Sequence, residues 1–146
     1  MDNFLLLKDL DKKVYFDGVA NELDVTPPLI EKDFWVCWIL KILFSLPESG
    51  NHLTFKGGTS LSKCYNVIKR FSEDVDVSIE RTFLTSQESI EPDRKQSSKE
   101  NQRRLDRLKQ ACQEKIADVI IPELKDKIGA ALSDMRKWEI KLDPDD

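Results

Sequence analysis

The residues best suited to chemistry begin with a glycine-rich turn in the segment FKGGTSLSK, which starts at Phe55. Gly57 and Gly58 lie between a candidate strand and a candidate helix, and Thr59 and Ser60 add two hydroxyl groups. Backbone N–H groups at a helix start are unpaired, and glycine lets the backbone approach an anion closely because no Cβ intervenes. The turn therefore predicts a phosphate site. An ordinary turn rich in small residues is the alternative, because neither P-loop spacing nor a third glycine is present.

Two carboxylates follow in the segment DVDVSI, at Asp74 and Asp76. On a strand, residues i and i+2 lie on the same face, roughly 7 Å apart. Two carboxylates in that arrangement can hold Mg²⁺, which prefers oxygen ligands and often binds through carboxylates and substrate phosphates. Phosphates held by the glycine turn would then meet a metal that neutralises a leaving pyrophosphate. The alternative is a solvated outer face of an edge strand.

The elements that must position these motifs are indicated by a switch between helical and alternating periodicity. Val75, Val77 and Ile79 alternate with polar residues, which predicts a half-buried strand. We expect an α+β fold in which helices flank a small mixed sheet, and we expect Pro122 to kink or restart the longest helix. The expected strands are residues 52–56, 74–80 and 137–142, and the expected helices are residues 11–23, 27–46, 59–69 and 98–131.

Length and composition favour one domain, because the chain has 146 residues and a formal net charge of −4. Three widely spaced cysteines with no CxxC pair favour reduced thiols, and hence a cytoplasmic protein. The longest apolar run, FWVCWILKILF, is too short to span a membrane. The expected parts of the single domain are a helical segment at 1–50, a core with both motifs at 51–82, a loop at 83–100, and a long helix with a final strand at 101–146.

A basic run, QRRLDRLKQ, lies in the last of these parts. It places Arg103, Arg104, Arg107 and Lys109 on the expected long helix. These side chains form either a solvated helix face or a contact with an RNA backbone, and such a contact would weaken steeply with salt.

The two motifs together resemble the nucleotidyltransferases of the AbiEii/AbiGii toxin family, in the DNA polymerase β-like superfamily. That superfamily carries an hG[GS] turn followed by a DhD strand, which correspond here to Gly57-Gly58 and Asp74-Val75-Asp76. The longer pattern, GGTSL followed by RFSEDVD, is more specific than either half. The upstream segment IEKDFWVCWIL is similar to the N-terminal helix of the family. The resemblance covers roughly residues 20–80 well and the remainder loosely.

The resemblance implies Mg²⁺-dependent transfer of a nucleotide from an NTP to an acceptor such as tRNA. It also implies a toxin–antitoxin or abortive-infection system with a cognate antitoxin protein. By resemblance, Asp74 and Asp76 are the catalytic metal ligands. The triphosphate-binding residues would be Gly57, Gly58, Thr59 and Ser60. Lys63 would reach a phosphate, or else it is a solvent-exposed helix lysine.

The sequence also departs from the family pattern. Members are usually much longer, and a further basic residue and a third acidic residue lie on later strands. The resemblance therefore leads us to expect a chain truncated at its C-terminus, with the third acid beyond residue 146 and weak or no transfer by this chain. The alternative function is a catalytically incomplete fragment that binds a nucleotide or a partner protein.

Overall fold

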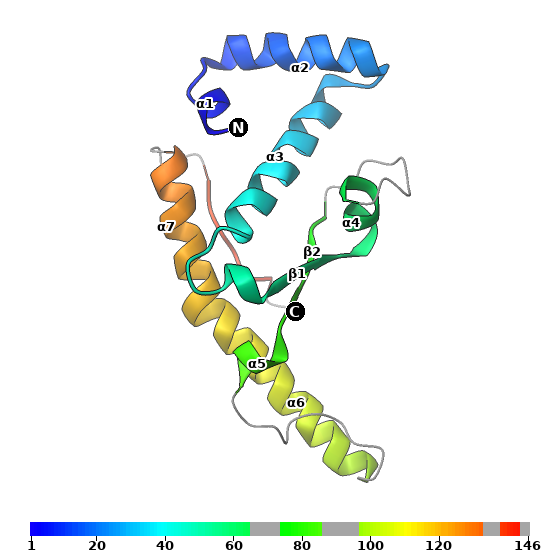
Figure 1. The fold of residues 1–146 in the computed structure, drawn as a ribbon, viewed down its shortest axis with the longest axis vertical. Helices are drawn as coiled ribbons and strands as arrows, with labels where there is room; N and C mark the ends of the chain where they lie inside the picture. The colour runs from blue at the N-terminus through cyan, green and yellow to red at the C-terminus, as the bar shows by residue number, and fades with distance from the viewer. Residues whose placement is uncertain (65–73, 86–96, 133–137, 144–146) are drawn as a thin grey trace.

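The computed structural model describes residues 1–64, 74–85, 97–132 and 138–143. Helices dominate this part of the chain, and one small sheet lies beside them (Figure 1). The elements in chain order are α1 (Asp2–Leu5), α2 (Asp9–Leu23), α3 (Pro27–Leu43), η1 (Gly50–His52), β1 (Leu53–Lys56), α4 (Gly57–Lys63), β2 (Asp76–Ile79), α5 (Arg81–Leu84), α6 (Ser98–Lys115), η3 (Ile116–Ile120) and α7 (Ile121–Leu132). The expected α+β class is confirmed.

The N-terminal helices begin and end where local chemistry requires. α2 ends at Leu23, and the next residue, Asp24, adopts the left-handed conformation at φ 54° and closes the helix by donating its N–H to the carbonyl of Ala20. α3 begins with Pro27 and Pro28, whose missing N–H groups would have no partner in a first turn. Both expected helices are confirmed, and α3 ends at Leu43, a few residues before the expected end.

An aromatic cluster holds α1 and α2 against α3. The ring centroid of Phe4 lies 4.8 Å from that of Phe34 and 5.3 Å from that of Phe16. Phe16 and Phe34 are themselves 6.0 Å apart in an edge arrangement. Such aromatic pairs add stabilisation beyond their buried area. The N-terminal pair of helices therefore packs at the far end of α3 from the sheet (Figure 1).

The long C-terminal helix contains the predicted irregularity. This helix consists of α6, η3 and α7. The start of α6 is capped by Ser97, whose Oγ accepts a hydrogen bond of 3.2 Å from the N–H of Glu100. Pro122 has no N–H for the carbonyl of Asp118, and this carbonyl lies in the π-helical segment η3. The α-helix then resumes at Ile121 as α7. The predicted effect of Pro122 is therefore confirmed as a π-helical interruption.

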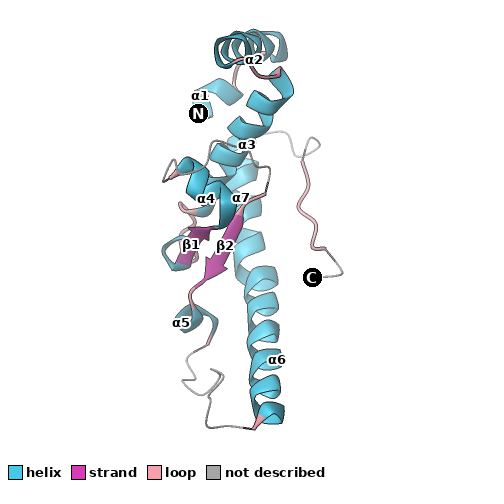
Figure 2. Ribbon diagram, turned by 90° about the vertical axis from the view of Figure 1, so that its right-hand side faces the viewer, coloured by secondary structure: helices cyan, strands magenta, loops and turns pink. Residues whose placement is uncertain are grey.

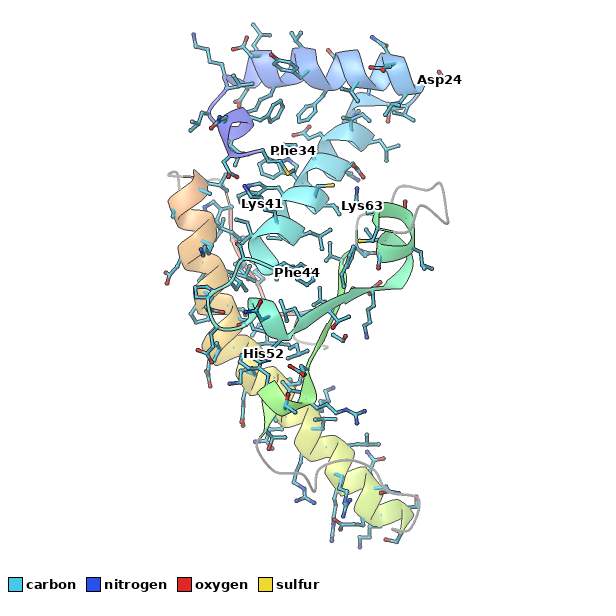
Figure 3. All side chains as sticks on the ribbon, viewed as in Figure 1. Asp24, Phe34, Lys41, Phe44, His52 and Lys63 are labelled. Atoms are coloured by element: carbon cyan, nitrogen blue, oxygen red, sulfur yellow. The ribbon has the colours of Figure 1, made fainter. Side chains whose placement is uncertain are left out.

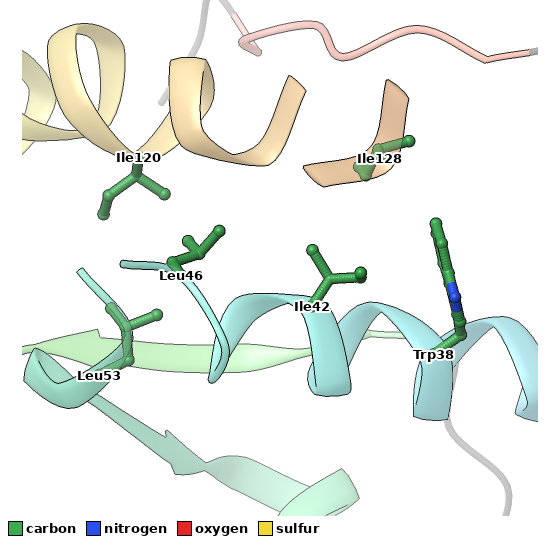
Figure 4. Packing of buried hydrophobic residues seen from close by; sticks show 6 residues of the cluster. All are labelled: Trp38, Ile42, Leu46, Leu53, Ile120 and Ile128. Atoms are coloured by element: carbon green, nitrogen blue, oxygen red, sulfur yellow. The ribbon is translucent and has the colours of Figure 1, made fainter. Parts of the chain in front are cut away.

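The hydrophobic core lies where α3, the start of β1 and the C-terminal helix meet (Figure 4). Trp38 and Ile42 face Ile128 across the gap between α3 and α7. The buried cluster consists of Trp38, Ile42, Leu46, Leu53, Ile120 and Ile128. Because one residue of β1 belongs to it, the core fixes the sheet relative to the helices.

The sheet is an antiparallel pair of β1 and β2 (Figure 2). Leu53 pairs with Ile79 at one end, and Lys56 pairs with Asp76 at the other. Val77 and Ile79 pack against the core, as their alternation predicts. The strands expected at 52–56 and 74–80 are thus confirmed over most of their length, and the pairing brings Asp76 to the end of β1 where α4 begins.

Three expectations about elements need correction. We expect a mixed sheet with a strand at 137–142. Residues 138–143 form no strand, and the described sheet consists of two antiparallel strands. Trp138 and Ile140 instead pack on the core as an extended segment, because alternation reports one-sided burial whether or not a neighbouring strand is present. The helix expected at 59–69 begins at Gly57, and its part beyond residue 64 lies outside the described residues.

The loop expected at 83–100 also differs at its ends. Residues 83 and 84 belong to α5, and residues 98–100 already belong to α6. The central part, 86–96, lies outside the described residues.

A stack of side chains ties α5 to both the sheet and α6. The His52 and Phe83 rings are parallel, with centroids 4.4 Å apart, and Lys115 Nζ lies 4.4 Å from the centroid of Phe83. His52 Nδ1 lies 2.7 Å from Glu80 Oε2, and the N–H of Glu80 donates to the carbonyl of His52. These contacts fix the end of β2 beside the C-terminal half of α6.

Among the described residues, the chain contains no helix that is long and apolar enough to cross a membrane.

Glu123 on α7 holds the turn between α3 and β1. Its carboxylate accepts hydrogen bonds from the N–H of Glu48 at 2.7 Å, the N–H of Ser49 at 3.1 Å and the Ser49 hydroxyl at 2.5 Å. Ser49 is fully buried. Burial raises the pKa of Glu123, but the hydrogen bonds from Ser49 and Glu48 outweigh it, so its pKa lies below the ordinary value of 4.5.

We predict that Glu123→Gln lowers the free energy of unfolding by about 1–3 kcal/mol near neutral pH, because a buried hydroxyl and two N–H groups lose a charged acceptor. Since the folded pKa is lowered, this contribution is present above pH 4.5 and is lost as the pH falls below it. Urea unfolding at neutral and acidic pH measures both effects. Asp126→Asn, an exposed position on the same helix, is the control, and an equal effect of both substitutions would contradict this role.

Candidate active site

The two sequence motifs meet at one point of the structure, where the Gly57 backbone contacts Asp76. Gly57 has a φ of +75°, and a Cβ built on it would lie 1.9 Å from Asp76 Oδ2. Other residues rarely adopt this conformation, and any side chain would collide with the carboxylate. Glycine at this position therefore allows an aspartate oxygen to lie directly against the start of α4.

Thr59 connects the same helix to Asp74, two residues before β2. It is 1% exposed, and its hydroxyl donates a 2.6 Å hydrogen bond to the carbonyl oxygen of Asp74. A threonine hydroxyl has a single proton to donate. That proton is used within the protein, so the Thr59 side chain sets the spacing between the glycine turn and the aspartates.

The carboxylates of Asp74 and Asp76 point away from the core. Both residues are exposed, whereas Val75 between them is half-buried. Within the described residues, neither carboxylate has a hydrogen-bonding or ion-pairing partner. Exposed oxygen ligands at i and i+2 fit a hard divalent cation such as Mg²⁺, which usually keeps several waters and adds substrate phosphates. The described residues contain no group of three His, Cys, Asp or Glu side chains that could hold a metal.

Lys63, labelled at the end of α4 in Figure 3, is paired with Asp33 on α3. Lys63 Nζ lies 2.5 Å from Asp33 Oδ1, and the two side chains are 19% and 30% exposed. The Cys37 thiol, one turn along α3, lies 3.9 Å from Asp33 Oδ2. Burial lowers the pKa of Lys63. The hydrogen bonds from Lys63 to Asp33 and Cys37 raise it by more, so the pKa of Lys63 lies above its ordinary value. The pair joins α4 to α3 as a partly buried ion pair.

The remaining predicted residues lie close to this point. Ser60 is 5% exposed, and Gly58 is half-buried in the first turn of α4. The roles of Gly57, Gly58, Thr59, Ser60, Lys63, Asp74 and Asp76 toward nucleotide and metal stay predictions.

Sequence reasoning missed Asp33 as a part of the site. It is the first residue of the strongly apolar segment DFWVCWIL, and a single carboxylate next to such a segment was the available signal. The identity of its partner depends on the packing of α4 on α3, which the local sequence does not specify.

Comparison with known protein families assigns the chain to one of them. An α+β fold with a glycine turn against an aspartate strand is that of a nucleotidyltransferase-like protein. Residues 38–145 match the family described as Nucleotidyl transferase AbiEii toxin, Type IV TA system. This match covers most of the chain and both motifs, and the chain belongs to this family. No curated protein and no solved structure matches it.

We predict that Gly57→Ala lowers the free energy of unfolding by more than about 1 kcal/mol, because the new methyl group requires a strained backbone and displaces Asp76. Gly18→Ala is the matched control. A Cβ at Gly18 meets nothing within 4 Å, so alanine in the middle of α2 is expected to stabilise by about 0.5–1 kcal/mol. Thermal or urea unfolding gives both values, and a neutral Gly57→Ala would disprove the close contact.

We predict that Asp33→Asn lowers the free energy of unfolding by about 1–3 kcal/mol, because the Lys63 ammonium loses a charged hydrogen-bond acceptor in a partly buried site. Hydrogen exchange of the amides in α4 should increase at the same time, since the pair attaches this helix to α3. Glu31→Gln, on an exposed position of α3, is the control. Unchanged protection of α4 in Asp33→Asn would show that the pair does not hold the helix.

Proposed function

We propose that this chain is a nucleotidyltransferase that binds an NTP with Mg²⁺ and transfers a nucleotide to an RNA acceptor such as tRNA. In this proposal Asp74 and Asp76 hold the metal, and the backbone of Gly57 and Gly58 receives the triphosphate together with Ser60. A cognate antitoxin is the expected protein partner, in keeping with the type IV toxin–antitoxin family to which the chain belongs.

The observation that carries the proposal is the contact between Asp76 and Gly57. A cation beside the Asp76 carboxylate would lie next to backbone N–H groups at the start of α4, which lack acceptors within the helix. The anionic substrate and the metal would thus occupy adjacent positions. Mg²⁺, when bound, neutralises charge on the phosphates and stabilises the leaving pyrophosphate.

The residues around this contact have separate tasks. The aspartates fix the cation, and their exposure leaves room for the substrate on the same face. Thr59 holds the Asp74 backbone at a fixed distance from α4. Lys63 is engaged by Asp33, so we assign it first to attaching α4, and a direct phosphate contact would require it to leave this partner. Small displacements of such groups can cost about a hundredfold in rate.

We predict that the protein binds an NTP only with Mg²⁺ and that Asp74→Ala with Asp76→Ala weakens this binding by more than about tenfold. The Thr59 hydrogen bond goes to the Asp74 backbone, so the substitution leaves that contact possible. Isothermal titration with each NTP, with and without Mg²⁺, measures binding, and incorporation of labelled nucleotide into bulk tRNA measures transfer.

Asp126→Ala on the exposed side of α7 is the matched control for the loss of an aspartate. Metal-independent NTP binding, or binding that survives the loss of both Asp74 and Asp76, would overturn the assignment of the site. Mg²⁺-dependent binding without any transfer to RNA would leave the nucleotide site in place and reject the acceptor.

A further inference from the structure

The helix α6 projects from the rest of the described structure as an arm (Figures 1 and 2). None of its 18 residues, Ser98–Lys115, is buried. An α-helix of that length extends about 27 Å. Its attachment lies at its C-terminal end, through Lys115 and the π-helical segment. Core packing therefore does not account for the N-terminal half of α6.

The charge of the arm is opposite to that of the chain. Within Ser98–Lys115 there are six basic and three acidic side chains, whereas the whole chain has a net charge of −4. Lys99, Arg103 and Arg107 are spaced by four residues and so share one face of the helix. A basic stripe on an acidic protein forms a local field that attracts polyanions.

Three arginines on the arm are oriented by one carboxylate. Glu100 lies 3.7 Å from Arg103 Nη1, 3.5 Å from Arg104 Nε and 3.2 Å from Arg107 Nη2. Arg107 Nε also donates to the carbonyl of Arg103 at 3.3 Å. The side chains of Arg103 and Arg107 nevertheless remain 64% and 51% exposed. One glutamate neutralises only part of the charge and restrains the arginines in place.

A guanidinium has five N–H donors in a planar fork that matches phosphate. The contacts with Glu100 use one nitrogen of each arginine, and exposed donors of Arg103 and Arg107 remain for a second anion. The arm is separated from Asp76 by the length of β2 and by α5. A mononucleotide at the glycine turn is therefore too short to reach it, whereas a polynucleotide can extend that far.

We propose that the face of α6 formed by Lys99, Arg103 and Arg107 docks the phosphate backbone of the acceptor RNA. This inference rests on the proposed function, because it concerns the acceptor of the same transfer reaction. The arm contributes affinity for a long RNA and contributes nothing to NTP binding. Recognition through phosphates is independent of base sequence and weakens as salt releases the electrostatic contacts.

The test is binding of bulk tRNA by the full chain across a salt series, followed by fluorescence anisotropy. Arg103→Ala with Arg107→Ala is expected to reduce affinity by about tenfold at low salt and to reduce the slope of log K against log salt by about 1.5. Lys13→Ala with Lys125→Ala removes the same charge from exposed positions on α2 and α7 and is expected to leave both values near those of the unmodified protein.

Glu100→Gln separates docking from a structural role of the arginines. If Arg103 and Arg107 dock phosphate, removing the competing carboxylate leaves the tRNA affinity of Glu100→Gln equal or higher. If they only hold Glu100, the tRNA affinity of the double arginine variant equals that of the lysine control variant. Equal affinities and slopes for the arginine and lysine variants, or no salt-dependent tRNA binding at all, would overturn the inference. NTP titration of the same preparations is read separately. If the double arginine variant shows normal Mg²⁺-dependent NTP binding and unchanged tRNA binding, the docking role of the arm is rejected and the nucleotide site is left intact.

Discussion

The site depends on the contact between the Gly57 backbone and the Asp76 carboxylate. The antiparallel register sets it, because pairing Lys56 with Asp76 leaves the next residue of the chain directly against that aspartate. Only glycine fits, since its φ is +75° and a Cβ would lie inside the carboxylate. A shift of the register by one residue would turn Asp76 toward the core and Val77 toward the turn. The motifs are therefore coupled by pairing as well as by proximity in sequence.

The surrounding structure maintains that register. Val77 and Ile79 on β2 pack on the core around Leu53, which prevents β2 from slipping on β1. Thr59 connects α4 to the backbone just before β2, and the pair of Lys63 and Asp33 connects α4 to α3. These contacts hold the backbone that carries the exposed carboxylates in place, as the proposed metal and phosphate site would require.

The elements that could be predicted from the sequence are those with local causes. Alternation from Val75 to Ile79 predicts β2, and Pro122 predicts a break in the last helix at the point where η3 occurs. The same rule fails for residues 138–143, since Trp138 and Ile140 alternate but pack on a core without a neighbouring strand. The pairing of Asp33 with Lys63 depends on the packing of two helices far apart in the chain, and no local pattern contains that information.

The most direct measurement of the central claim uses Mn²⁺ as a paramagnetic substitute for Mg²⁺. If the aspartates and the glycine turn form one metal and phosphate site, Mn²⁺ should selectively broaden the amide signals of Gly57, Gly58 and Thr59, and Asp74→Ala with Asp76→Ala should abolish the broadening. Amide signals of α4 that stay sharp while Asp74 and Asp76 bind the ion would show that the carboxylates and the glycine turn do not share a site. Broadening confined to the acidic residues near Asp143 would also contradict the account.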